Sequence, residues 1–186
     1  MNAVTDIAGL SNEEKAWFAL YTRSRCEFKA AEQINALGIH LYMPTVTRIR
    51  QWSDRKKKIT EPVLRCYIFI YATEKERSAS LELYHVTRCI FDQGKPAKIP
   101  AWQIKNLANM LKENRDFFVY EGIVPGVHVR IKDGPFAGVI GTVQEMGNGK
   151  TFAVSIHLLN RSVIAHLPKD STFEVLKNFE QSFKAR

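Results

Sequence analysis

The alternation of apolar and polar positions predicts a sheet covered by helices in the first part of the chain. The longest nearly uninterrupted apolar stretch is Pro62–Tyr71, which is rich in strand-forming residues. Alternation along one central strand would place Tyr67 and Phe69 on one face and Ile68 and Ile70 on the other. Because both faces are apolar, both must be covered. The aromatic residues could simply belong to the core, or they could form a binding surface.

The same patterning predicts the neighbouring elements. Strands are expected at Trp17–Tyr21, Ile39–Arg50 and Val86–Phe91, and helices at Phe28–Leu37, Ala72–Tyr84 and from Pro100 to near Lys112. The order strand, helix, strand, strand, helix, strand, helix predicts an α+β fold, in which three helices pack on an antiparallel sheet.

From Pro125 onward the pattern changes to short strands separated by glycine-containing turns. The expected strands are Val127–Lys132, Val139–Met146, Phe152–Leu159, Ser162–His166 and Phe173–Leu176. Five short strands in so few residues predict a small β-barrel. The expected divisions are a loose terminus (1–15), a first domain (16–112), a linker (113–124), the barrel (125–177) and a tail (178–186). The linker contains Phe117–Tyr120, so part of it should pack on a domain.

Charge is concentrated in the first domain. The whole chain carries a net charge of +8, of which residues 1–112, with 18 Lys and Arg against 11 Asp and Glu, contribute +7. A basic surface on one part of a small protein favours a polyanion, most often nucleic acid.

Composition argues against several other classes of protein. The sequence has no apolar stretch near the length of a membrane span and no cleavable signal pattern at its start, which predicts a cytoplasmic protein. The three cysteines and five histidines are scattered, so we expect no metal and no cofactor. No carboxylate pair, and no nucleophile with a base, stands at informative spacing, so an enzyme is not expected.

A polar connection precedes the central strand and predicts a basic hairpin. Residues 48–58 contain six basic residues and one acidic residue. The cations Arg55, Lys56, Lys57 and Lys58 could follow a phosphate backbone, while Trp52 offers a ring for an unstacked base. A solvated hairpin tip is the alternative interpretation.

The predicted barrel contains a glycine-rich turn with a structural logic. Asp133 can bond to downstream amides, Gly134 admits positive φ, and Pro135 fixes the next φ. Gly138 and Gly141 allow close backbone approach. A phosphate-binding loop would need a following helix, which is not expected here.

These stretches together resemble the NusG family of transcription elongation factors. The segment from Val129 to Val143, with Asp133-Gly134-Pro135-Phe136 at its turn, resembles the KOW motif of an SH3-like barrel, and the domain before it resembles the NGN domain. The resemblance also rests on Trp17-Phe18-Ala19-Leu20-Tyr21 followed by Arg25, on Trp52-Ser53-Asp54-Arg55, on Tyr67-Ile68-Phe69-Ile70, and on Gly94-Lys95-Pro96 with Ile99-Pro100.

The resemblance implies a role and its residues. The NGN-like domain would grip the clamp helices of the largest subunit of RNA polymerase and suppress pausing. Tyr67 and Phe69 match the family's apolar contact pair, with Leu64 and Ile90 beside them. Arg23, Arg25 and Lys29 match the region that, in the specialised relative RfaH, meets the non-template DNA strand; upstream DNA is the other expected nucleic-acid partner.

Two departures from the family pattern suggest that the chain is a specialised member of the family. Leu64-Arg65-Cys66-Tyr67 replaces the common Phe-Pro-Gly-Tyr, and Leu158-Leu159-Asn160-Arg161 replaces the Ile-Phe-Gly-Arg of housekeeping members, which puts recruitment of Rho in doubt. The chain most resembles UpxY-type antiterminators of capsular polysaccharide operons. We expect it to be a monomer whose KOW domain binds a partner that the sequence does not identify. The alternative is a KOW-containing module that binds RNA or the ribosome.

RfaH can hold its C-terminal domain as a helical hairpin, but the glycines and Pro135 argue against that state here. In a helix each glycine would cost about 1 kcal/mol and an interior proline about 3 kcal/mol relative to alanine. A β-barrel without autoinhibition is therefore expected.

Overall fold

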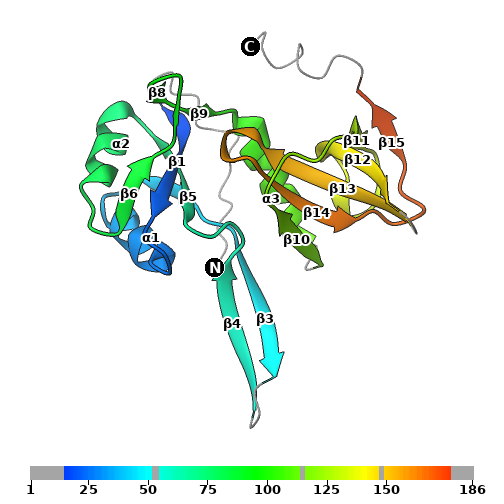
Figure 1. Ribbon diagram of the computed structural model, residues 1–186, viewed down its shortest axis with the longest axis horizontal. Coiled ribbons are helices and arrows are strands. Elements are labelled where there is room, and N and C mark those ends of the chain that lie inside the picture. Colours follow the sequence, from blue (N-terminus) through cyan, green and yellow to red (C-terminus); the bar gives the residue numbers. More distant parts are fainter. Residues whose placement is uncertain (1–14, 52–54, 114–115, 147–148, 177–186) are drawn as a thin grey trace. The chain divides into compact units, whose positions relative to one another are not determined.

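The computed structural model describes residues 15–51, 55–113, 116–146 and 149–176. Contacts divide the chain into two compact units, Met1–Ala101 and Trp102–Arg186 (Figure 1). This division differs from the one expected from the sequence, since the third helix falls in the second unit apart from its first residue.

A five-stranded antiparallel sheet forms the centre of the first unit. Its strands are β1 (Ala16–Thr22), β2 (His40–Tyr42), β5 (Tyr67–Ala72), β6 (Val86–Cys89) and β9 (Lys98–Ile99). The order is β2-β5-β1-β6, and β9 also pairs with β1. The inner strands β1 and β5 are in register with Phe18 opposite Ile70. The antiparallel sheet expected from the sequence is therefore confirmed.

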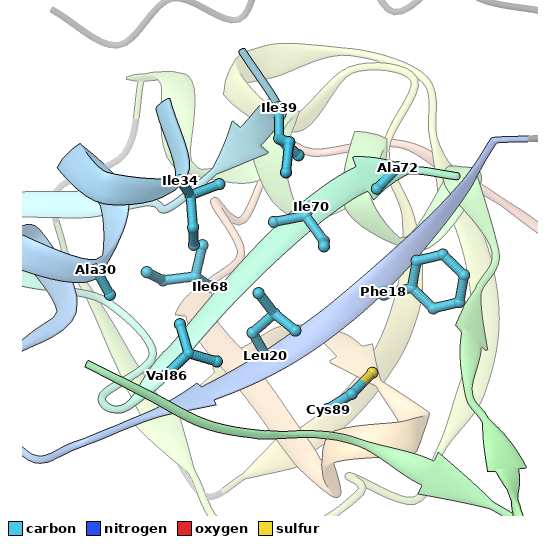
Figure 2. Close-up of a cluster of buried hydrophobic side chains, with 10 residues drawn as sticks. All are labelled: Phe18, Leu20, Ala30, Ile34, Ile39, Ile68, Ile70, Ala72, Val86 and Cys89. Atoms are coloured by element: carbon cyan, nitrogen blue, oxygen red, sulfur yellow. The ribbon is translucent and has the colours of Figure 1, made fainter. Parts of the chain in front are cut away.

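One face of this sheet packs on the first helix, α1 (Glu27–Ala36). Alternate residues of β1 and β5 meet one face of α1 in a buried apolar cluster (Figure 2). Its largest members are Phe18, Leu20, Ile34, Ile68 and Ile70, each at most 1% exposed. Burial of each such side chain stabilises the fold by about 1.5–3 kcal/mol. The sequence correctly predicted that Ile68 and Ile70 share a face.

The prediction of one strand over Pro62–Tyr71 is wrong, because a turn divides this stretch. Strand β4 ends at Pro62, and β5 begins at Tyr67. Cys66 has a left-handed φ of 63°, and its N–H donates to Oε1 of Glu27 at 2.8 Å. The Tyr67 N–H reaches back to the Leu64 carbonyl at 3.3 Å. This turn redirects the chain into the sheet while Leu64 stays buried.

A capping box begins the second helix, α2 (Glu74–Leu81), which is shorter than the expected Ala72–Tyr84. The Thr73 hydroxyl accepts from the Glu76 N–H at 3.2 Å, and Glu76 Oε2 accepts from the Thr73 N–H at 2.7 Å. Nζ of Lys15 donates to the other carboxylate oxygen at 3.0 Å. The bond from the Thr73 backbone, aided by Lys15, lowers the pKa of Glu76 below its usual value. The backbone N–H groups of Thr73 and Glu76, which the start of a helix would otherwise leave unpaired, are thus both hydrogen-bonded.

Glu76→Gln is expected to make the first unit less sensitive to acid. Because the folded-state pKa of Glu76 is lowered, its contribution to stability is present above the unfolded pKa and is lost as the pH falls through the folded one. The variant keeps an acceptor but has no titration, so its free energy of unfolding should fall less between about pH 6 and about pH 3. Urea unfolding across this range measures the difference. Glu32→Gln, on the exposed face of α1, is the control, and equal acid sensitivity of wild type and Glu76→Gln would contradict the assignment.

A separate two-stranded hairpin, the arm, leaves the sheet of the first unit. It consists of β3 (Thr45–Gln51) and β4 (Lys56–Pro62), which pair only with each other among the described strands and extend away from α1 and the sheet (Figure 1). A second small hairpin joins β7 (Phe91–Asp92) to β8 (Lys95–Pro96), and its turn residues Gln93 and Gly94 both have positive φ.

The second unit contains a six-stranded antiparallel sheet. Its strands are β10 (Phe117–Tyr120), β11 (Val127–Ile131), β12 (Ile140–Met146), β13 (Gly149–Ile156), β14 (Arg161–His166) and β15 (Phe173–Val175), in the order β10-β14-β13-β12-β11-β15. Short 3-10 turns lie at Gly134–Phe136 and His157–Leu159. The five strands expected after Pro125 are all present, and they pair in one sheet. The sheet has one further strand, β10, which lies in the segment expected to be a linker and pairs with β14.

The third helix, α3 (Ala101–Glu113), is hydrogen-bonded to this sheet through the side chain of Asn106. The amide of Asn106 donates to the Ile140 carbonyl at 2.9 Å and accepts from the Ile140 N–H at 3.3 Å. Asn106 is only 6% exposed. A buried amide satisfied in this way fixes the position of the helix along β12.

Candidate functional site

The face of the first sheet that is turned away from α1 is aromatic. We call Trp17, Tyr21, Tyr67, Phe69 and Tyr71 the aromatic face; they come from the neighbouring strands β1 and β5. The rings of Tyr21 and Tyr67 lie edge to face with centroids 5.2 Å apart, and Trp17 meets Tyr71 at 5.5 Å. The register Tyr21↔Tyr67 and Trp17↔Tyr71 explains these contacts, because directly opposed residues share a face.

Exposure varies along the aromatic face. Phe69 is fully buried and stacks on Tyr42 of β2 at 6.2 Å, and Trp17 is 4% exposed. Tyr21, Tyr67 and Tyr71 are each half-buried. Burial raises the pKa of Tyr42, so its hydroxyl stays neutral. A partner reaching this face as the structure has it would touch the tyrosines and not Phe69.

Cationic and polar groups surround the Tyr21 end of the aromatic face. The guanidinium of Arg88, which lies opposite Tyr21 on β6, sits 5.2 Å from the Tyr21 ring centroid. The nearby Cys66 thiol, more than any other group, raises the pKa of the Tyr21 hydroxyl. Tyr21 therefore remains a neutral hydrogen-bonding group, and Arg88 is held over its ring by a cation–π interaction.

The other residues expected to contact polymerase occupy different environments. Leu64 is 2% exposed in the turn before β5. Ile90 is half-buried between β6 and β7, where its N–H bonds to the Ala19 carbonyl at 2.9 Å and its carbonyl accepts from Ala97 at 2.9 Å. Of the four predicted contact residues, Tyr67 and Ile90 are therefore half-buried, while Leu64 and Phe69 are buried.

The three cations expected at the first strand-to-helix turn are all exposed. The guanidinium of Arg23 lies 4.1 Å from the ring centroid of Tyr84, and its backbone N–H bonds to the His85 carbonyl at 3.0 Å. Arg25 takes a left-handed φ of 60°, and Lys29 lies on α1. The backbone bond joins the turn to the segment before β6, so cations from two parts of the sequence lie at one end of the sheet.

Sequence reasoning did not single out Tyr21, Tyr84 or Arg88 as site residues. Tyr84 is 66% exposed, which is unusual for a large aromatic residue, and Arg88 is exposed on β6. Alternation along Val86–Cys89 would not have placed Arg88 outward, because Val86 and Cys89 are both buried and the pairing of β6 with β1 shifts register between Thr22 and Tyr21. The pairing of Arg88 with Tyr21 depends on the register of two strands that are distant in sequence, for which the sequence holds no local signal.

The cations expected on the arm are exposed. Arg55, Lys56, Lys57 and Lys58 all lie at the surface, whereas Trp52 falls outside the described residues. Arg48 and Ile49, on the opposite strand of the arm, are also exposed.

The glycine-rich turn of the second unit holds its sheet together. Asp133 accepts from the backbone N–H of Thr172 at 2.9 Å and from the Thr172 hydroxyl, and these bonds lower the pKa of Asp133. Gly134 and Gly138 have positive φ, as expected for Gly134. Phe136 is buried against Phe152, with ring centroids 5.6 Å apart.

A Cβ atom at Gly141 would lie 2.4 Å from the Ala153 carbonyl oxygen, so close packing of β12 and β13 requires glycine there. The close approach at Gly141, the bonds to Asp133 and the positive φ of Gly134 all serve to shape the sheet of the second unit. The glycine-rich turn therefore has a structural role.

Within residues 15–51, 55–113, 116–146 and 149–176, no three His, Cys, Asp or Glu side chains are grouped so that they could hold a metal ion. In the same part of the chain, none of the helices has the length and apolar character needed to cross a membrane.

Comparisons with solved structures give distant similarities. The structure that describes domain interaction in Thermotoga maritima NusG is 21% identical, with a TM-score of 0.44, and the match covers 83% of this chain and 94% of that one. The crystal structure of the MjSpt4:Spt5 complex in conformation A is 16% identical, with a TM-score of 0.30, and the match covers 87% and 98%. A comparison with curated protein sequences gives no match.

A family model gives the assignment. The model for NusG, described as transcription termination factor nusG, matches residues 15–108, which are just over half of the chain and contain the aromatic face, the arm and the first-turn cations. The protein therefore belongs to the NusG family of transcription elongation factors.

Proposed function

We propose that this protein binds RNA polymerase through the exposed part of the aromatic face and promotes elongation or antitermination at a restricted set of operons. The observation that carries the proposal is the pair Tyr21 and Tyr67, whose half-buried rings contact each other on neighbouring strands of the first sheet. Half-buried tyrosines lose little conformational entropy on binding and are enriched among the residues that dominate interface energies. Phe69 belongs to the same face but is fully buried, so it is not part of the proposed contact.

The surrounding cations suggest a second partner for the same unit. Arg23, Arg25, Lys29 and Arg88 are exposed near the Tyr21 end of the face, and the arm adds Arg55 and Lys56–Lys58. Such charges favour nucleic acid, and we propose non-template or upstream DNA at the polymerase surface. Clamp helices of the largest polymerase subunit would then meet the tyrosines, and DNA would meet the cations beside them.

The loop between β13 and β14 supports a specialised role. Leu159 is 5% exposed and Asn160 takes a left-handed φ of 48°. A loop whose central apolar residue is buried offers little anchor to a partner protein, because anchors are large side chains that enter a partner's pocket. We propose that this loop does not recruit Rho and that the second unit has a different partner in the cytoplasm.

Tyr67→Ala is expected to weaken co-purification with RNA polymerase by roughly 30-fold, the loss typical of one interface hot spot. Tyr120→Ala, which removes an exposed aromatic residue from the second unit, is the control and should bind as wild type. Circular dichroism of both variants checks the fold. Equal polymerase binding by Tyr67→Ala and wild type would contradict the proposed contact.

An antitermination assay tests the functional part of the proposal. Transcription through a terminator should increase when wild-type protein is added to polymerase and should not increase with Tyr67→Ala. A protein that binds polymerase but leaves readthrough unchanged would show that the contact has another purpose.

A further inference from the structure

A buried carboxylate links the start of α1 to the turn that precedes β5. It belongs to Glu27, the first residue of α1, which is 4% exposed. Glutamate is rarely buried this deeply unless it has a partner. Here Oε1 of Glu27 accepts a hydrogen bond of 2.8 Å from the backbone N–H of Cys66, which is 39 residues further along the chain. The bond therefore connects two distant parts of the first unit.

Cys66 needs support because cysteine disfavours the conformation it adopts. Its φ of 63° is left-handed. In left-handed backbone the Cβ atom of a non-glycine residue comes too close to the following carbonyl oxygen. Such a residue keeps this conformation only where its surroundings hold it. Glu27 holds the N–H of Cys66, and the Thr22 N–H at the end of β1 donates to its carbonyl at 2.9 Å.

The position of Tyr67 depends on this turn. Tyr67 follows Cys66 directly and is the first residue of β5. Its N–H donates to the Leu64 carbonyl at 3.3 Å, so the start of the strand is bonded to the turn itself. The Tyr67 ring meets the Tyr21 ring edge to face, with centroids 5.2 Å apart. A change of φ at Cys66 would redirect the chain immediately before Tyr67 and would separate the two rings.

The helix that carries Glu27 is packed firmly on the sheet. Ala30 and Ile34 of α1 are each 0% exposed and belong to the same buried cluster as Ile68 of β5 (Figure 2). Glu27 lies three residues before Ala30, so the helix places both on the face that meets the sheet. A group carried by a packed helix is held more precisely than one on a loop. Glu27 thus offers the turn a fixed hydrogen-bond acceptor.

We propose that Glu27 is a positioning residue for the polymerase contact: its buried carboxylate holds Cys66 in the left-handed conformation and so keeps Tyr67 against Tyr21. Because Glu27 is buried, it acts through Tyr67 and does not touch the partner. The inference rests on the proposed function, since it names what prepares the same tyrosine pair for binding. A surface that is already ordered binds more tightly because less ordering remains to be done on binding.

A role of Glu27 in stability alone would have a different signature. Removing the carboxylate leaves the N–H of residue 66 without its acceptor whichever residue stands there, so the free energy of unfolding should fall in either case. The conformation of residue 66, in contrast, depends on its side chain, because glycine adopts positive φ readily. Cys66→Gly should therefore keep the turn without help from Glu27, although it cannot replace the lost hydrogen bond.

The experiment is a double-mutant cycle in the full-length protein, with Glu27→Ala, Cys66→Gly and the two combined. Each variant is measured for affinity to RNA polymerase, for free energy of unfolding, and for nuclear Overhauser contacts between the rings of Tyr21 and Tyr67. Comparing Glu27→Ala in the two backgrounds cancels the loss of the Cys66 thiol beside Tyr21.

Three further variants complete the set. Glu27→Gln keeps an acceptor oxygen, and Glu32→Ala, on the exposed face of α1, is the matched control. Glu27→Asp, whose shorter side chain draws the carboxylate away from the turn, gives the same cycle if Glu27→Ala does not fold.

With Cys66 in place, Glu27→Ala should weaken polymerase binding roughly tenfold, the factor that corresponds to the cost of left-handed backbone at a non-glycine residue. In the Cys66→Gly background the same change should weaken binding by less than about twofold. The loss of unfolding free energy should be similar in both backgrounds. The ring contacts should weaken in Glu27→Ala and return in the double variant, while Glu27→Gln and Glu32→Ala should bind as wild type.

Equal losses of binding in the two backgrounds would overturn the proposal, because they would show that Glu27 acts through stability alone. Ring contacts that are unchanged in Glu27→Ala would overturn it as well. Failure of the proposed function looks different, since Tyr67→Ala would then bind polymerase as wild type does. In that case the ring contacts, which are measured without polymerase, still decide whether Glu27 positions Tyr67.

Discussion

Phe69→Ala is expected to lower the free energy of unfolding of the first unit by about 3–5 kcal/mol, as is typical when a large aromatic side chain is removed from a core. Phe69 is 0% exposed and stacks on Tyr42 at 6.2 Å, so its removal leaves a cavity within the aromatic face. Urea unfolding followed by circular dichroism measures the loss. If Phe69→Ala binds polymerase more weakly, we expect the cause to be the destabilised first unit and not the loss of a direct contact.

Tyr67→Ala is the matched comparison, because Tyr67 lies on the same strand and the same face but is half-buried. It should cost clearly less stability than Phe69→Ala while it weakens polymerase binding more directly. If Phe69→Ala were as stable as wild type yet lost polymerase, Phe69 would have to be a contact residue that becomes exposed.

Gly141→Ala is expected to destabilise the second unit by about 1–3 kcal/mol or more, the usual range for overpacking a filled interior. The added Cβ would lie 2.4 Å from the Ala153 carbonyl oxygen and 2.8 Å from two ring atoms of Phe152. The carbonyl belongs to β13 and cannot rotate away without disturbing the ladder between β12 and β13. Hydrogen exchange of the amides in β12 and β13 should become faster.

Gly149→Ala provides the control for this substitution. A Cβ at Gly149 meets no atom within 4 Å, and Gly149 is exposed at the start of β13. The same chemical change should therefore leave exchange rates in the sheet nearly unaltered. Equal effects at positions 141 and 149 would show that the loss of glycine flexibility, and not the contact with Ala153, determines stability.

Much of the fold follows from the sequence because its signals are local. Alternation in Ala16–Thr22 and Tyr67–Ala72 sets the two faces of the first sheet, and the glycines around Asp133 mark turns of the second. The break before Tyr67 could not be predicted, because a cysteine gives no sign of the left-handed conformation that Cys66 adopts. Strand β10 has no periodic pattern, and its pairing depends on β14, far along the chain.

The sequence predicted which residues share a face in the candidate site, but not how deeply each one is buried. Alternation assigned Tyr67 and Phe69 to one face, yet it could not show that Phe69 is fully buried while Tyr67 is half-buried, because burial depends on what packs above the strand. The cations of the first turn were found from their charge. Tyr84 and Arg88 join them only through tertiary contacts with Arg23 and Tyr21.

The pairing of β10 with β14 has a consequence for the order in which the protein is made. Tyr120 lies opposite Ser162, so the ribosome must add about forty more residues after β10 before its partner exists, which takes about 2–8 seconds at ordinary rates of synthesis. During that interval Phe117–Tyr120 are apolar residues on a nascent chain without their sheet. The sheet of the second unit can therefore close over β10 only after β14 has been made.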